Sequence, residues 1–173
     1  MAIAHAGFGG GCHWCTEAVF QSLNGVTKVA QGYIASDSPH DSYSEAVDVH
    51  WNPDEIGFDD LIGVHLVTHA SSSDHKMRGK YRSAIYVDGD EARLEAQAIL
   101  ERLSAEIGQR FVTSVLPYRS FKPSDERFQD YYARNREGPF CEAYIEPKLA
   151  ILRQRFGQLQ QSAQPQTLVK ETP

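Results

Sequence analysis

An α+β fold, a single domain in which helices pack on a mixed β-sheet, is the class that this sequence predicts. Segments of strand and helix character alternate along 173 residues without a strict strand–helix–strand repeat. A chain of this length suits one domain and can bury roughly 70% of its unfolded surface. Apolar residues make up 41% of the chain and charged residues 23%, an ordinary globular composition.

Each expected strand is a short run rich in apolar and β-branched residues between turn signals. The third is the clearest, because Val47, Val49 and Trp51 share one face while Asp48 and His50 share the other. The strands are expected at residues 3–8, 26–34, 46–51, 83–87 and 111–116.

Each expected helix is recognised from its periodicity or from a signal at one end. Asn24-Gly25 ends the first helix, because glycine commonly follows a last helical turn. Ser124 is expected to cap the fourth helix, and Pro147 suits the first turn of the last. The helices are expected at residues 12–23, 58–69, 91–107, 124–135 and 147–156.

The domain is expected to span residues 1–157, followed by a polar, glutamine-rich and disordered tail over residues 158–173. A net charge of −6 argues against non-specific nucleic-acid binding. No stretch approaches the ~18 continuous apolar residues of a membrane span, and we find no signal peptide at the amino terminus. Three cysteines do not suit a secreted disulfide scaffold, so a cytoplasmic location is expected.

The most informative stretch joins the first strand to the first helix. Gly9-Gly10-Gly11 lets the backbone turn sharply and leaves space for a ligand. Cys12 follows at the first turn of the expected helix, where unpaired amides and the helix dipole favour a thiolate. A reactive nucleophile is therefore favoured over the alternative, a small buried cysteine.

Cys12 and Cys15 have a C-x-x-C spacing, which leaves two other classes of protein open. One is a thioredoxin-like disulfide oxidoreductase that uses both thiols. The other is a zinc-binding interaction module whose ligand set is completed by His65 and His69, one helical turn apart. The long gap between the two pairs, and the lack of a glutamate beside His65, disfavour the zinc module.

Glu45 begins the alternating strand and falls on the same face as Val47 and Val49. A carboxyl on the core side loses contact with water and can keep a proton, which suits a general acid. A solvated carboxyl just outside the strand is equally compatible with the pattern.

Several segments, in order from Gly7 to Leu149, resemble the methionine sulfoxide reductases of the A type. Gly11-Cys12-His13-Trp14 is similar to the family's Gly-Cys-Phe-Trp signature. The other matching segments are Ser44-Glu45-Ala46-Val47, Lys80-Tyr81-Arg82-Ser83-Ala84-Ile85-Tyr86, Phe128-Gln129-Asp130-Tyr131-Tyr132, Pro139-Phe140-Cys141 and Pro147-Lys148-Leu149.

The resemblance implies a ferredoxin-like α/β sandwich and the reduction of methionine S-sulfoxide, in proteins or free. Cys12 would attack the sulfoxide sulfur while Glu45 supplies a proton to the oxygen and Tyr81 a hydrogen bond. Cys12 would be left as a sulfenic acid and condense with a second thiol, and thioredoxin would reduce the disulfide. Cys141 would be the resolving thiol, with Cys15 as the alternative.

The resemblance implies no metal or organic cofactor, and the net charge and the lack of a long apolar stretch already argue against nucleic-acid and membrane partners. Trp14 would line the pocket for the substrate methyl group. Three departures concern the substrate site. His13 replaces the usual phenylalanine, Tyr43 is the nearest candidate for a second oxygen-binding tyrosine in a shortened loop, and Asp74 would stand in for the family's active-site aspartate.

Overall fold

The computed structural model describes residues 4–10, 13–68, 82–108, 110–135, 138, 139 and 141–159, and of residues 13, 141 and 144 it describes the backbone alone. Residues 160–173, most of the expected tail, lie outside the described residues. The described chain ends in a 3-10 turn, Gly157–Leu159, and the backbone N–H of Asn24 donates to the Leu159 carbonyl at 2.7 Å.

Six strands form one mixed sheet in the order β5-β4-β1-β3-β2-β6. The central four strands are antiparallel to one another, whereas β5 joins β4 in parallel and β6 joins β2 antiparallel. The strands are β1 (Ala4–Gly9), β2 (Val26–Ala35), β3 (Ser44–Trp51), β4 (Ala84–Val87), β5 (Ser114–Pro117) and β6 (Ser120–Pro123).

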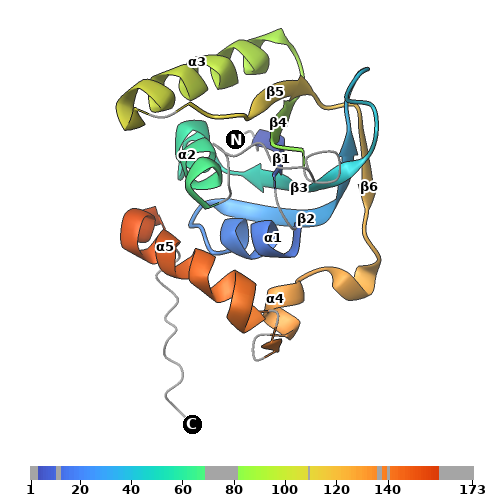
Figure 1. The fold of residues 1–173 in the computed structure, drawn as a ribbon, viewed down its shortest axis with the longest axis vertical. Helices are drawn as coiled ribbons and strands as arrows, with labels where there is room; N and C mark the ends of the chain where they lie inside the picture. The colour runs from blue at the N-terminus through green and yellow to red at the C-terminus, as the bar shows by residue number, and fades with distance from the viewer. Residues whose placement is uncertain are drawn as a thin grey trace.

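The first four strands alternate with two helices as β1-α1-β2-β3-α2-β4, the order of the expected ferredoxin-like sandwich. Helices α1 and α2 contact each other, and α5 packs on both of them. Figure 1 shows α3 lying along the top of the molecule beside β5, with α4 and α5 at the lower end. The helices are α1 (His13–Gln21), α2 (Phe58–Thr68), α3 (Asp90–Ile107), α4 (Tyr131–Arg134) and α5 (Glu146–Phe156).

The main core lies between the sheet and helices α1 and α2. The alternation expected in β3 is confirmed, because Val47, Val49 and Trp51 all belong to this core. Phe8 of β1 and Phe20 of α1 are fully buried, with ring centroids 4.7 Å apart. Burying a side chain of this size contributes roughly 1.5–3 kcal/mol, so the contact fixes α1 on the strand that precedes it.

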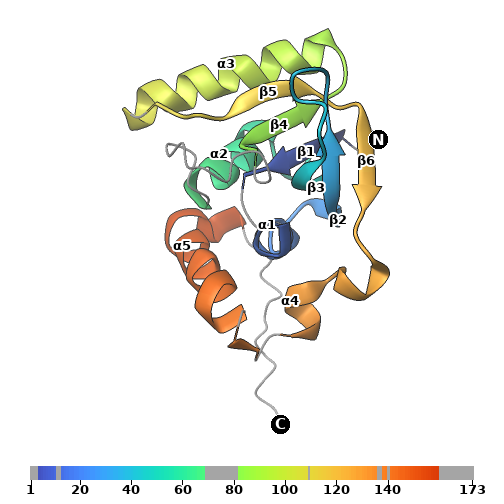
Figure 2. The same ribbon diagram turned by 45° about the vertical axis from the view of Figure 1, so that its right-hand side comes forward.

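The opposite face of the sheet curls around a smaller cluster. Strands β5 and β6 stand at opposite edges, yet only Tyr118 and Arg119 separate them in the chain. A flat sheet would place these edges roughly 24 Å apart, whereas three residue steps reach at most about 11 Å. The sheet therefore curls until its edges approach, as Figure 2 shows. The enclosed cluster contains Ile34, Ala46, Ala84 and Tyr86, covered by Leu116, Tyr118 and Phe121.

The expected helix over residues 124–135 is wrong. A 3-10 turn, Glu126–Phe128, is capped by the Asp125 side chain and separated from the single turn of α4 by Asp130, which has φ 57°. Distant partners cause the break: the Gln129 side-chain amide donates to the backbone carbonyl of Gln31 at 2.9 Å and accepts from its N–H at 3.0 Å. Strand β6 and a π-helical turn, Cys141–Ile145, were not expected.

Within the described part of the chain, no helix has both the length and the apolar character needed to cross a membrane.

Candidate functional site

The glycine-rich loop leaves the sheet where three neighbouring strands meet. Gly9 pairs with Ala46 of β3 on one side and with Ala84 of β4 on the other. A Cβ at Gly9 would lie 3.0 Å from the Arg82 carbonyl oxygen and 3.1 Å from that of Glu45. Glycine is therefore needed at position 9. The chain that continues toward Cys12 passes here between the backbone of Glu45 and that of Arg82, the residue after Tyr81. Cys12 and Tyr81 themselves lie outside the described residues.

Glu45 lies within β3 and is 8% exposed, which decides against the solvated alternative. It pairs with Tyr33 of β2, so the two side chains leave the same face of the sheet. Tyr43 is 46% exposed, and its hydroxyl lies 2.6 Å from Ser120 Oγ of β6. Tyr33, rather than Tyr43, is thus the tyrosine directly opposite Glu45. Sequence analysis missed it because the register of β2 against β3 is not visible in a pattern.

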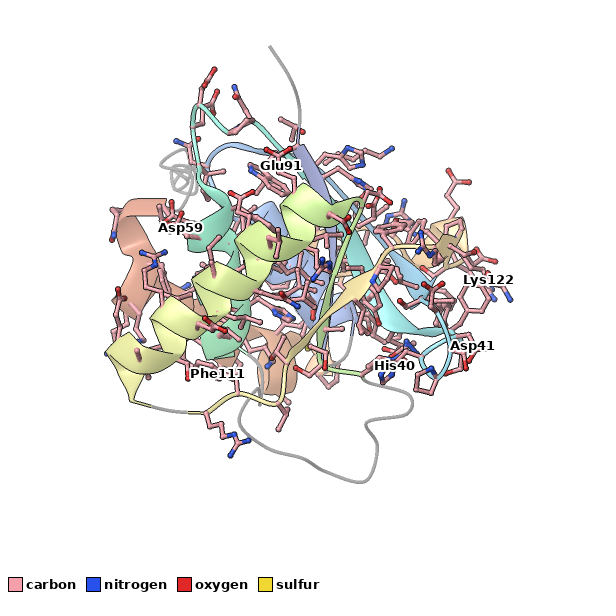
Figure 3. All side chains as sticks on the ribbon, turned by 90° about the horizontal axis from the view of Figure 1, so that it is seen from above. His40, Asp41, Asp59, Glu91, Phe111 and Lys122 are labelled. Carbon is pink, nitrogen blue, oxygen red and sulfur yellow. The ribbon has the colours of Figure 1, made fainter. Side chains whose placement is uncertain are left out.

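Arg82 fastens the loop before β3 to the start of β4. Its buried guanidinium donates to the carbonyl oxygens of His40 at 3.1 Å and Ser42 at 2.6 Å, and its backbone N–H donates to Ser44 Oγ at 2.8 Å. Figure 3 shows His40 and Asp41 on this loop, on the same side of the molecule as Lys122 of β6. Arg82 therefore couples the position of Glu45 to the segment that carries Tyr81.

Replacing Arg82 by lysine should lower the free energy of unfolding by about 2 kcal/mol. The two guanidinium nitrogens of Arg82 bind one loop carbonyl each, and the single nitrogen of lysine does not reproduce this planar fork. Urea unfolding followed by circular dichroism measures the change. Arg119→Lys is the matched control, since Arg119 binds Asp37 of the same loop in solvent and should change stability little. Equal effects of the two substitutions would contradict the role of Arg82.

An aromatic wall stands at the start of α1. The Trp14 ring is stacked on Tyr131, with centroids 4.0 Å apart and planes 5° apart, and Phe128 lies 5.7 Å away by the same measure. These rings come from segments more than 100 residues apart. Trp14 follows the predicted nucleophile Cys12 by two residues in the sequence. Phe128 and Tyr131, which pack against Trp14, were not predicted as site residues.

Glu17 holds this wall in place. Its fully buried carboxylate accepts hydrogen bonds from the backbone N–H groups of Asp130 at 2.7 Å and Tyr131 at 3.2 Å, and from Gln31 Nε2 at 2.7 Å. Burial raises the pKa of Glu17 above its ordinary value, although these three hydrogen bonds act in the opposite direction. Glu17, one helical turn after Trp14, thus fixes the backbone that carries Tyr131 against α1.

The two other cysteines differ in their surroundings. Cys15 is buried in the main core on α1, and Cys141 begins the π-helical turn that packs against α1. The Cys141 side chain lies outside the description, as do the His13 side chain and the whole of Asp74 and His69.

His65, a ligand in the zinc alternative, forms a hydrogen bond to the backbone of β1. It is fully buried in α2, and its Nε2 lies 2.8 Å from the Gly9 carbonyl oxygen. A carbonyl can only accept, so Nε2 carries the proton and serves as the donor, and this ring nitrogen cannot ligate a metal. His65 thus anchors the end of β1 immediately before the glycine-rich loop.

The family model described as "Peptide methionine sulfoxide reductase" matches residues 4–160. The chain belongs to this family. The peptide methionine sulfoxide reductase MsrA of Deinococcus radiodurans is 37% identical over 166 residues, covering 87% of this chain and 81% of that protein. The MsrA of Thermus thermophilus is 32% identical over 164 residues, covering 87% of this chain and 93% of that protein. Membership of a reductase family decides against both the thioredoxin-like oxidoreductase and the zinc module.

Solved structures share the fold of this reductase-family chain. Methionine sulfoxide reductase A of Corynebacterium diphtheriae superposes with a TM-score of 0.66 at 23% identity, covering 79% of this chain and 76% of that one. Reduced Mxr1 from Saccharomyces cerevisiae gives 0.67 at 23% identity, with 82% and 91% covered. Mxr1 in complex with Trx2 gives 0.55 at 20% identity, with 75% and 84% covered. The expected α+β class is confirmed.

Proposed function

We propose that this chain reduces the S-sulfoxide of methionine, in proteins or free, with Cys12 as the nucleophile. Family membership supports the reaction class. The observation that carries the residue assignment is the meeting of three strands at Gly9. It brings Glu45, Gly9 and Arg82, the residue after Tyr81, to the same end of the central strands.

The proposed reaction begins when the Cys12 thiolate attacks the sulfoxide sulfur. Glu45 supplies a proton to the sulfoxide oxygen, and Tyr81 donates a hydrogen bond to it. The attack forms a bond between the two sulfur atoms. The oxygen then transfers to the Cys12 sulfur as this bond and the substrate's sulfur–oxygen bond break, so that methionine leaves in reduced form and Cys12 becomes a sulfenic acid. The burial of Glu45 supports its role, because a carboxyl out of water can hold the proton that this step consumes.

Recycling follows by condensation of the sulfenic acid with a second thiol, which forms a disulfide and releases water. Cys141 is the proposed resolving thiol, supported by the packing of its turn against α1. Cys15, the alternative, is enclosed in the core, where an incoming reductant has less access. Thioredoxin is the proposed reductant, since a yeast relative of the same fold has been solved in complex with Trx2.

The proposed substrate pocket is bounded by the aromatic wall of Trp14, with Phe128 and Tyr131 behind it. Apolar rings suit the methyl group and sulfur of the substrate. Tyr33 is proposed beside Tyr43 as a candidate for the second oxygen-binding tyrosine, because it stands opposite Glu45. His13 and Asp74 are proposed at the remaining border. We propose a cytoplasmic location, where thioredoxin keeps thiols reduced, and a reaction that needs no cofactor.

The test uses a peptide that carries each epimer of methionine sulfoxide, with dithiothreitol as reductant. The wild-type chain should reduce the S epimer alone, and Cys12→Ser should abolish the reaction. Cys15→Ser, three residues further along the chain, is the matched control and should retain it. Activity in Cys12→Ser, or loss in Cys15→Ser from folded protein, would contradict the assignment. With thioredoxin as reductant, Cys141→Ser should complete one turnover and then stop.

A further inference from the structure

A second group of chemically competent side chains lies on the other face of the sheet and toward the other end of β1. His5 of β1 pairs in register with His50 of β3, and Asp48 lies two residues before His50 on the same face. The face is the one that carries Ala46, opposite to Val47 and Val49. His5 and Gly9 are four residues apart along β1, roughly 13 Å, so the group is separate from the proposed reductase site.

The three side chains converge on one point. Each carboxylate oxygen of Asp48 faces a different imidazole: Oδ2 lies 3.1 Å from His50 Nε2, and Oδ1 contacts His5 Nε2. The two imidazole rings have centroids 4.7 Å apart. Each residue offers one ligand atom: a ring nitrogen from each histidine and a carboxylate oxygen from Asp48. These three atoms lie within 4.8 Å of one another.

Two imidazoles and a carboxylate form a ligand set that late first-row divalent metals prefer. Zinc binds nitrogen and oxygen ligands at about 2.0–2.2 Å, so tetrahedral ligand atoms are roughly 3.3 Å apart. The observed spacing needs a small adjustment to hold an ion at the centre. The ion would replace the protons that now link the imidazoles to the carboxylate.

The surroundings leave an entry from solvent and keep the carboxylate charged. The side chains of His5 and His50 are 30% and 32% exposed, whereas Asp48 is 12% exposed. Burial acts to raise the pKa of Asp48, but hydrogen bonds and charge from the two histidines bring it below its ordinary value. Asp88 adds negative charge near His5. Lys28, exposed and in register with His50, is the one basic residue of β2.

Tyr118 supports Asp48 from the connection between β5 and β6. Its hydroxyl donates to Asp48 Oδ1 at 3.1 Å, and its ring packs 4.9 Å from the His5 ring. Burial, with the nearby Asp48 charge, raises the pKa of Tyr118 far above its ordinary value, so the phenol keeps its proton. It therefore orients the carboxylate as an outer partner, as hydrogen-bonded neighbours of metal ligands commonly do.

We propose that His5, Asp48 and His50 form a binding site for one divalent transition-metal ion of the zinc type, with water completing the coordination. Three protein ligands and a solvent-facing side describe an open site. An ion there would join β1 to β3 through side chains and would take no part in the sulfoxide chemistry.

The test titrates the full-length reduced protein with Co²⁺ and follows its visible absorption. His50→Ala and Asp48→Asn are the site variants, and His40→Ala is the matched control. Wild type and His40→Ala should bind about one ion per chain, with visible cobalt bands and without near-ultraviolet thiolate charge transfer. The site variants should weaken binding at least about tenfold. Equal affinity in His50→Ala, or a thiolate band accounting for the bound ion, would overturn the proposal.

A second measurement does not depend on the folding of any variant. Long-range ¹H–¹⁵N spectra of wild-type protein report the imidazole nitrogens, and Zn²⁺ should shift the Nε2 signals of His5 and His50 together. A shift confined to other histidines, or no shift while Zn²⁺ binds elsewhere, would overturn the site.

Discussion

Replacing Glu45 by glutamine should lower kcat for sulfoxide reduction by about 10²-fold to 10⁴-fold, the range expected when a general acid is lost. Glutamine has nearly the same shape as glutamate and can stay in β3 opposite Tyr33, but it has no proton to give the sulfoxide oxygen. KM should change much less than kcat, because the aromatic wall around Trp14 is untouched. Steady-state kinetics with a peptide S-sulfoxide measures both constants.

Glu101→Gln is the control for this experiment, since Glu101 is an exposed residue of α3. A Glu45→Gln protein that keeps wild-type kcat would remove the proton-donor role. Tyr33→Phe and Tyr43→Phe can be measured in the same assay. The register of β2 and β3 leads us to expect the larger loss of kcat for Tyr33→Phe.

Replacing Glu17 by alanine should lower the free energy of unfolding by about 3 kcal/mol. It should also disrupt the stacking of Trp14 on Tyr131 in the aromatic wall. The substitution removes the acceptor of two backbone N–H groups and one of the two acceptors of Gln31 Nε2, which still donates to the Phe128 carbonyl. Each lost hydrogen bond costs roughly 1–3 kcal/mol, which local rearrangement and water reduce. Urea unfolding measures the stability, and Trp14 fluorescence should report the loss of the Tyr131 stack. Glu101→Ala, on the surface, should leave both unchanged.

The pH dependence of stability gives a second measure of Glu17. Because its pKa is raised in the folded state, the folded protein holds this proton more tightly than the unfolded chain does. Its contribution should therefore favour folding below the ordinary value of 4.5 and decline as pH rises from there through the folded pKa. Glu17→Gln should flatten this part of the stability curve. A curve of unchanged slope would show that Glu17 titrates normally.

Local patterns in the sequence were sufficient to predict much of the fold. The polar–apolar alternation of β3 placed Val47, Val49 and Trp51 on the core face, and the glycine run located the connection from β1 to α1. Interactions between distant segments could not be predicted in this way. Arg82 acts through a loop 40 residues away, and Gln129 interrupts an expected helix because its amide pairs with Gln31, 98 residues away. No local period encodes such pairs.

The two ends of the sheet have a consequence for self-association. Of the described strands, β5 and β6 form the edges, and each is four residues long and ends in proline, Pro117 and Pro123. Proline has no N–H to donate, and so short a strand offers little backbone for another chain to extend. The three longer strands, β1, β2 and β3, are all interior. The curled sheet should therefore resist edge-to-edge aggregation, a useful property for a protein proposed to act on oxidatively damaged chains.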